Sequence, residues 1–188
     1  MDEQSDISLI ECTLEGNQQA FEQLVLRYQR RLVGSLQHLL GDADDALDVA
    51  QQTFLLAWSK LSSFRGESAF YSWLYRIARN VAHSEKRRSR IQTSSLESMI
   101  ESGGSEPVGA ATPSHAGEAD EHIEAVRNAL MQIPEEFRQP LILKEIDGLS
   151  YDEIHSILGI PTGTVRSRIF RARQELAVRL KRELRDDG

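Results

Sequence analysis

Residues 147–173 read DGLSYDEIHSILGIPTGTVRSRIFRAR and contain the signals that decide the fold of this chain. Ser150 precedes a short amphipathic stretch, and Glu153 follows three positions later, which is the pattern of a capping box. Gly159 supplies the positive φ of a tight turn, and Pro161 opens a second helix where its missing N–H costs little. The stretch therefore predicts a helix-turn-helix whose second helix enters the DNA major groove.

The second helix of this unit presents side chains that suit the reading of base pairs. We expect four residues to read them: Arg166, Ser167, Phe170 and Arg171. Arginine forms paired hydrogen bonds with guanine, a hydroxyl donates or accepts, and an apolar ring contacts the methyl group of thymine. Arg168 and Arg173 are expected to touch phosphates or acids of their own domain. The alternative is a solvated basic helix stabilised by pairs such as Arg171–Glu175.

His155 stands where the first helix of the unit is expected to cross the second closely. A small residue is usual at such a crossing. We interpret His155 as a tolerated packing residue rather than a pH switch.

The chain has 188 residues and a formal charge of −7, an average composition for a soluble protein. This total does not indicate DNA binding, because DNA-binding domains are usually basic. The charge is distributed in blocks, however. There are seven bases against two acids in residues 62–91 and eight against two in residues 161–185, whereas residues 1–26 and 92–126 hold acids and no lysine or arginine. Two basic segments on either side of an acidic one indicate two surfaces that face nucleic acid.

The acidic middle of the chain lacks the signs of a folded element. In residues 102–117, nine of sixteen positions are Gly, Ser or Pro, and no apolar periodicity remains. This composition predicts a flexible acidic linker over residues 93–118, between an N-terminal domain of residues 1–92 and a C-terminal domain of residues 119–188. Domains this small are marginally stable alone, which fits a protein that works on a partner.

Both domains are predicted to be helical, so the expected fold class is all-α. Apolar residues recur at helical spacing over residues 20–36 and again over residues 43–61. Ser68 is expected to cap a further helix that runs to about Arg90. No stretch alternates as a strand does, and the first domain is therefore predicted to be a bundle of about four helices.

The segment 64–80, FRGESAFYSWLYRIARN, packs five of the chain's twelve aromatic residues among arginines. Not all of these rings can be buried with the core stripe of the same helix. Rings exposed among arginines suit stacking on unpaired bases, and a glycine-containing loop could form a pocket for an extruded base. Tyr71 and Tyr75 are the rings we expect to face solvent, whereas Phe70 and Trp73 fit a core or rim position equally well.

The sequence lacks the patterns of a membrane protein, a secreted protein and a metal-binding protein. No run of about 18–20 apolar residues could span a membrane, and the acidic start lacks the basic and apolar regions of a signal peptide. Cys12 is the only cysteine, and no histidines stand at metal-ligand spacing. We therefore expect a cytoplasmic protein that is not an enzyme and holds no metal or cofactor.

Four ordered stretches resemble one known family. They are DVAQQTF (48–54), FRGESAFYSWLYRIARN (64–80), DGLSYDEI (147–154) and PTGTVRSRIFRAR (161–173). Together they closely resemble the extracytoplasmic-function sigma factors, and the sigma-E-like group in particular. The resemblance implies a helical region 2 and a helix-turn-helix region 4 that bind core RNA polymerase, direct it to promoters and help to open the −10 element.

The resemblance also implies a role for each matching residue. Those at the −10 element would be Phe64, Arg65, Tyr71, Tyr75, Arg76 and Asn80. Asp48, Gln51 and Phe54 would lie on the β′ clamp helices of the polymerase, although the family often has Glu at the position of Gln52. The base-reading residues of the helix-turn-helix would read the −35 element, while the second domain meets the β flap. The family further implies regulation by an anti-sigma factor.

Three other classes of protein compete with this interpretation. A free-standing helix-turn-helix regulator would bind promoter DNA as a dimer without polymerase, but it leaves the aromatic segment 64–75 unexplained. An enzyme with a helical sensor domain lacks a catalytic constellation. An adaptor docking through its acidic N-terminus leaves both basic segments without a role.

Overall fold

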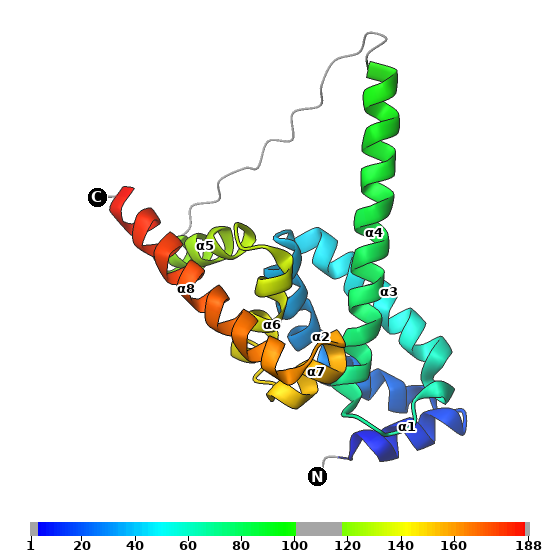
Figure 1. Ribbon diagram of the computed structural model, residues 1–188. Helices are drawn as coiled ribbons and strands as arrows, with labels where there is room; N and C mark the ends of the chain where they lie inside the picture. Colours follow the sequence, from blue (N-terminus) through cyan, green and yellow to red (C-terminus); the bar gives the residue numbers. More distant parts are fainter. Residues whose placement is uncertain (1–3, 101–117, 187–188) are drawn as a thin grey trace.

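The computed structural model describes residues 4–100 and 118–186, with side chains over residues 4–88 and 123–182. Every regular element within those ranges is a helix, which confirms the all-α prediction. Figure 1 shows two groups of helices, α1–α4 and α5–α8, which we call the first half and the second half.

The first half is a bundle of four α-helices, as predicted. They are α1 (Asp6–Leu14), α2 (Gln18–Leu40), α3 (Ala43–Lys60) and α4 (Phe70–Ile100), with a short 3-10 turn, η1 (Leu61–Ser63), after α3. The side chains of Ser5, Asn17 and Asp42 cap the first three helices by accepting backbone N–H bonds. Leu24, Leu36 and Leu74 are among the fully buried residues between the helices. These residues are the first half's part of the hydrophobic core.

Helix α4 differs from its prediction at both ends. It begins at Phe70 and not directly after Ser68, whose hydroxyl accepts a hydrogen bond of 3.3 Å from Arg76. It continues to Ile100 and therefore includes the first part of the predicted linker, 93–118, where no glycine or proline interrupts the helix. The rest of that linker, up to residue 117, lies outside the described residues.

The second half contains α5 (Glu118–Met131), α6 (Glu135–Glu145), α7 (Tyr151–Leu158) and α8 (Thr162–Asp186). Ser150 and Glu153 form the predicted capping box at the start of α7. Gly159 ends that helix in the left-handed conformation, with φ of 68°. Since α8 begins directly after Pro161, the predicted helix-turn-helix is confirmed.

The two halves pack against each other. Helices α2 and α4 of the first half contact α5, α6 and α7 of the second, and buried residues of both halves form one hydrophobic cluster. At one point of contact, a Cβ added to Gly41 would lie 2.8 Å from the Met131 side chain. Because Gly41 also has φ of 84°, both its backbone and its neighbour favour glycine there. The halves therefore form one body in this conformation.

Candidate nucleic-acid interface

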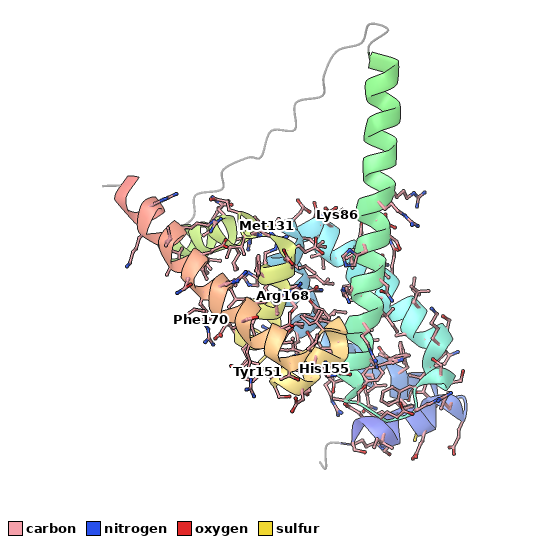
Figure 2. All side chains as sticks on the ribbon, in the orientation of Figure 1. Lys86, Met131, Tyr151, His155, Arg168 and Phe170 are labelled. Atoms are coloured by element: carbon pink, nitrogen blue, oxygen red, sulfur yellow. The ribbon has the colours of Figure 1, made fainter. Side chains whose placement is uncertain are left out.

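The outer face of α8 is open to solvent. The residues predicted to read bases are all exposed on it: Arg166, Ser167, Phe170 and Arg171. The opposite face buries Val165, Ile169 and Ala172, since residues three and four apart share one side of a helix. Phe170 is 61% exposed and points away from the first half (Figure 2). An apolar ring left in solvent between arginines suits contact with DNA.

Two other arginines of α8 are held by acids of their own half. Arg168 donates a hydrogen bond of 3.0 Å to Glu136, and Arg173 lies 2.5 Å from Glu145. Both acids belong to α6, and the pairs therefore tie α8 to the helix beneath it. Of the two roles expected for these arginines, the structure supports contact with the domain's own acids.

The pairing that would turn α8 into an ordinary solvated helix does not form within the described residues. Glu175 pairs with Arg179 at 3.0 Å and not with Arg171. Arg166 lies over the ring of Tyr151 at the start of α7, with its guanidinium carbon 5.2 Å from the ring centroid. Both arginines expected to read bases therefore keep their side chains on the exposed face.

His155 is exposed, and its Nδ1 lies 2.7 Å from the carbonyl oxygen of Ile160. The prediction that His155 packs at a close helix crossing was therefore wrong. Ile154 and Leu158 of α7 and Val165 of α8 are buried instead, and the imidazole of His155 (labelled in Figure 2) meets the turn before α8.

Phe64 belongs to an aromatic cluster at the start of α4. Its ring is half-buried and meets the rings of Phe70 and Trp73 edge-on, at centroid distances of 5.8 and 5.5 Å. Phe70 is only 2% exposed and belongs to the core. Edge-to-face contacts of this kind hold the loop before α4 against the bundle.

Tyr71 and Tyr75 were expected to face solvent, and they do not. Their exposed fractions are 2% and 0%. Tyr28 and Arg31 of α2 lie on the Tyr71 ring, and groups of the second half meet both hydroxyls, namely Asp147 at Tyr71 and Gln139 of α6 at Tyr75. Burial, followed by the charge of Asp147, raises the pKa of both hydroxyls. The segment around Tyr71 and Tyr75 could not predict this burial, since the residues of the second half that meet them lie more than sixty positions later in the sequence.

The other members of the predicted −10 set are more accessible. Arg65 and Asn80 are exposed, and Arg76 is partly buried beside Ser68. These side chains come from the loop before α4 and from the first turns of the helix. The structure thus divides the predicted set into an open part and a part covered by the second half.

The exposed face of α3 contains two predicted polymerase-binding residues and two that the sequence analysis missed. Asp48 and Gln51 are exposed, whereas Phe54 is half-buried against the core. Leu47 and Leu55 stand one turn before and after Gln51, with exposed fractions of 52% and 67%. The sequence could have indicated them, because these leucines stand outside the apolar stripe that predicts the core face of this helix. Exposed apolar side chains of this kind are typical of a contact surface.

Asp147 of the second half is enclosed by donors of the first. Its carboxylate accepts a hydrogen bond of 2.9 Å from the Tyr71 hydroxyl and a short one from the Ser35 hydroxyl. Arg31 donates to the main-chain oxygen of Asp147 at 2.6 Å, and its Nε lies 3.6 Å from the carboxylate. The Asp147 side chain is 0% exposed. We call Arg31, Ser35 and Tyr71 the donor triad.

Two opposed effects act on the pKa of Asp147. Burial raises the pKa of its carboxyl, whereas the hydrogen bonds from Ser35 and Tyr71 and the charge of Arg31 lower it. The net shift is upward. The donor triad therefore favours an anion, and the loss of solvent opposes it.

A second polar contact joins the halves near the middle of α4. Lys86 donates to Glu135 of the second half at 2.8 Å, and His83 lies 3.6 Å from the same carboxylate. Burial alone would raise the pKa of Glu135, but Lys86, His83 and Arg138 together lower it. This contact is more open to solvent than the one around Asp147, because Lys86 is 68% exposed.

Comparison with known proteins divides the chain at the same place as the structure. Residues 24–91 match the family model described as Sigma-70 region 2, and residues 123–176 match the one described as Sigma-70, region 4. The chain is 39% identical to the RNA polymerase sigma-H factor of Pseudomonas aeruginosa, over 98% of both proteins. It is 42% identical to the ECF RNA polymerase sigma-E factor of Escherichia coli, over 92% of both.

Two solved structures share the fold. CnrH in complex with the cytosolic domain of CnrY matches with a TM-score of 0.71 and 27% identity, covering 94% of this chain and 97% of that one. The sigma factor RpoE in complex with the anti-sigma factor NepR from Bartonella quintana matches with a TM-score of 0.65 and 30% identity, covering 86% and 96%.

The described residues contain neither a membrane-spanning helix nor a cluster of metal ligands. Within them, no helix is both long and apolar enough to pass through a bilayer. Within the same ranges, no three His, Cys, Asp or Glu side chains gather closely enough to hold a metal ion.

Proposed function

Because the chain belongs to the extracytoplasmic-function group of the sigma-70 family, we propose that its two halves divide promoter recognition between them. As a sigma factor, it directs promoter-specific transcription initiation by RNA polymerase. The observation that carries the proposal is the exposed arginine face of α8 in one half, together with the aromatic and basic segment 64–80 in the other.

The second half reads the −35 element through α8. Arg166 and Arg171 bond guanine edges, Ser167 donates or accepts, and Phe170 contacts a thymine methyl group. The exposure of these side chains supports the proposal, as do the ion pairs of the neighbouring Arg168 and Arg173 with acids of α6. The same half rests on the β flap of the polymerase.

The first half binds and helps to open the −10 element through Phe64, Arg65, Tyr71, Tyr75, Arg76 and Asn80. Tyr71 and Tyr75 are covered by the second half, so their contact with DNA requires the halves to separate. The packed arrangement is then a closed form, and the polymerase-bound protein is the open one.

The face of α3 binds the β′ clamp helices of core polymerase. Asp48 and Gln51 supply polar contacts, and the exposed Leu47 and Leu55 supply apolar area beside them. Phe54 supports this face from below, because its ring packs against the core.

Three further properties belong to the proposal. An anti-sigma factor controls the chain, which the similar sigma factor RpoE bound to the anti-sigma factor NepR supports. The protein works in the cytoplasm, where core polymerase and the chromosome are found. It catalyses no reaction of its own, since initiation chemistry belongs to the polymerase.

Run-off transcription tests the proposal. Purified core polymerase is supplied with fragmented genomic DNA from the source organism, with and without the chain, and the transcripts are sequenced. We expect new start sites that share −10 and −35 elements and depend on the chain. Start sites that do not change on its addition would contradict the proposal. Tight promoter binding by a dimer without polymerase would favour the free-standing regulator instead.

A further inference from the structure

The donor triad is an anion site that belongs to the first half alone. Arg31 and Ser35 stand one turn apart on α2, and Tyr71 approaches them from the first turn of α4. The guanidinium of Arg31 lies 3.8 Å from the centroid of the Tyr71 ring, which holds the two side chains together. All three residues therefore belong to helices of the first half.

The group that occupies this site in the closed form is an oxyanion, the Asp147 carboxylate. It accepts from both hydroxyls and lies within ion-pair distance of the guanidinium. A DNA phosphate offers the same chemistry, namely oxygens that accept from arginine, serine and tyrosine donors.

Two further observations point to nucleic acid as the alternative occupant. Tyr71 belongs to the segment 64–80, which holds three arginines against one glutamate. In addition, 37% of the Arg31 side chain remains exposed even when the halves are packed. A strand following α4 would therefore meet a cation that reaches solvent.

We propose that Arg31, Ser35 and Tyr71 bind a backbone phosphate of the single-stranded promoter DNA, and that Asp147 occupies this site as its intramolecular substitute. This inference rests on the proposed function, since it assigns one more contact to the same DNA-binding half. It adds Arg31 and Ser35 to the DNA-binding residues and makes closure and strand binding mutually exclusive.

The inference differs from a simple latch in what Arg31 does. In a simple latch, Arg31 only holds Asp147, and its loss exposes DNA-binding surface just as the loss of Asp147 does. If Asp147 and a DNA phosphate share the site, removing Asp147 frees the site for the phosphate. Removing Arg31 also opens the protein, but it weakens the phosphate site at the same time. The two residues then have opposite effects on DNA affinity once the protein is open.

The experiment uses fluorescence anisotropy to measure how tightly the full chain binds a fluorescein-labelled oligothymidylate of twelve nucleotides, at several salt concentrations. The variants are Asp147→Ala, Asp147→Ala with Arg31→Gln, and Asp147→Ala with Arg30→Gln. Arg30 is exposed and adjacent in sequence, so its variant removes the same charge from the same helix without touching the site. Circular dichroism and melting confirm that each variant is folded.

We expect Asp147→Ala to bind the oligonucleotide at least about five-fold more tightly than the unchanged protein. Adding Arg31→Gln reverses most of that gain and lowers the slope of log K against log salt by about 0.7, the value for one phosphate contact to a single strand. Adding Arg30→Gln leaves affinity within about two-fold. If Arg31→Gln fails to fold, Ser35→Ala in the Asp147→Ala protein serves instead, with a smaller loss of affinity.

Equal affinity and equal salt slope for the Arg31→Gln and Arg30→Gln proteins would overturn the inference, as would no gain from Asp147→Ala. The outcome is separable from that of the proposed function, because run-off transcription does not depend on this assay. A chain that directs initiation but shows no Arg31-dependent salt slope contradicts only the phosphate site.

Discussion

The hydroxyl of Tyr71 donates a hydrogen bond of 2.9 Å to the carboxylate of Asp147, which lies 76 positions later in the chain. One partner comes from the segment predicted to meet the −10 element, and the other from the turn that leads into the helix-turn-helix. The bond therefore joins the two halves of the protein directly.

Replacing Asp147 with alanine is expected to open the protein, whereas replacing it with asparagine is not. Alanine leaves the Ser35 and Tyr71 hydroxyls buried without an acceptor, which costs about 1–3 kcal/mol each. Asparagine keeps an oxygen for Tyr71 and offers an N–H to Ser35 in nearly the same volume. Small-angle X-ray scattering checks this, with a larger radius of gyration for Asp147→Ala alone. An equally enlarged Asp147→Asn protein would contradict the account.

Closure is expected to strengthen as the pH falls through the raised pKa of Asp147. The pKa of Asp147 is raised in the closed form above its ordinary value of 3.8, so the closed form binds a proton more readily than the open one. The gain begins as pH falls through the raised pKa and is complete below about 3.8. Arg31, Ser35, Tyr71 and Tyr75 are the charged or titratable groups and hydroxyls around this carboxyl.

Glu135 acts in the opposite direction, because its lowered pKa removes its contribution as the pH falls below the ordinary value of 4.5. Scattering measured above pH 5 therefore excludes the contribution of Glu135. The Asp147→Asn protein is the control, since it remains closed and has no proton to gain at that position. A pH response that persists in this variant would assign the effect to another group, such as His83 beside Glu135.

Arg166 is expected to contribute base specificity, and Arg168 is not. Arg166→Ala should cost about 1–3 kcal/mol at the matching base pair of the −35 element and relax the preference there. Arg168→Ala removes an ion pair with Glu136 and should leave the base preference unchanged. Transcription from promoter libraries randomised at the −35 element compares the two proteins. A shift in preference with Arg168→Ala and none with Arg166→Ala would refute the assignment.

Leu55 is expected to bind core polymerase. It is 67% exposed, so Leu55→Asn should leave the folded protein unchanged while it removes about 1.5–3 kcal/mol of apolar burial at the polymerase surface, or more than about ten-fold in affinity. Leu26→Asn is the matched control, because Leu26 is 61% exposed on α2. Affinity for core polymerase is measured by fluorescence of labelled protein. Equal losses for both variants would argue against a specific role for α3.

The capping box of α7 is expected to stabilise the helix-turn-helix. Ser150→Ala removes the two hydrogen bonds of the Ser150 hydroxyl, one accepted from the Glu153 backbone N–H and one donated to the Glu153 carboxylate, and should cost about 0.5–2 kcal/mol in urea unfolding. Ser156→Ala, in an exposed position inside the same helix, should have no such cost. If the Ser150→Ala protein kept its full stability, the capping box would have no energetic role.

Local signals in the sequence were sufficient for the helix-turn-helix. Ser150, Glu153, Gly159 and Pro161 each act on their own backbone or on residues a few positions away, and the structure contains each feature where it was predicted. The exposed face of α8 followed from helical periodicity for the same reason. Capping, turn formation and amphipathicity are short-range, so one sequence sufficed to predict them.

The fate of Tyr71 and Tyr75 was decided by tertiary structure alone. Aromatic residues among arginines looked like an exposed nucleic-acid surface, and periodicity says nothing about a second half that packs over them. Their burial depends on contacts such as Tyr71 with Asp147 and Gly41 with Met131, between residues about 75 to 90 positions apart. Which of two basic surfaces is covered depends on the free energy of packing between halves, and no local pattern encodes it.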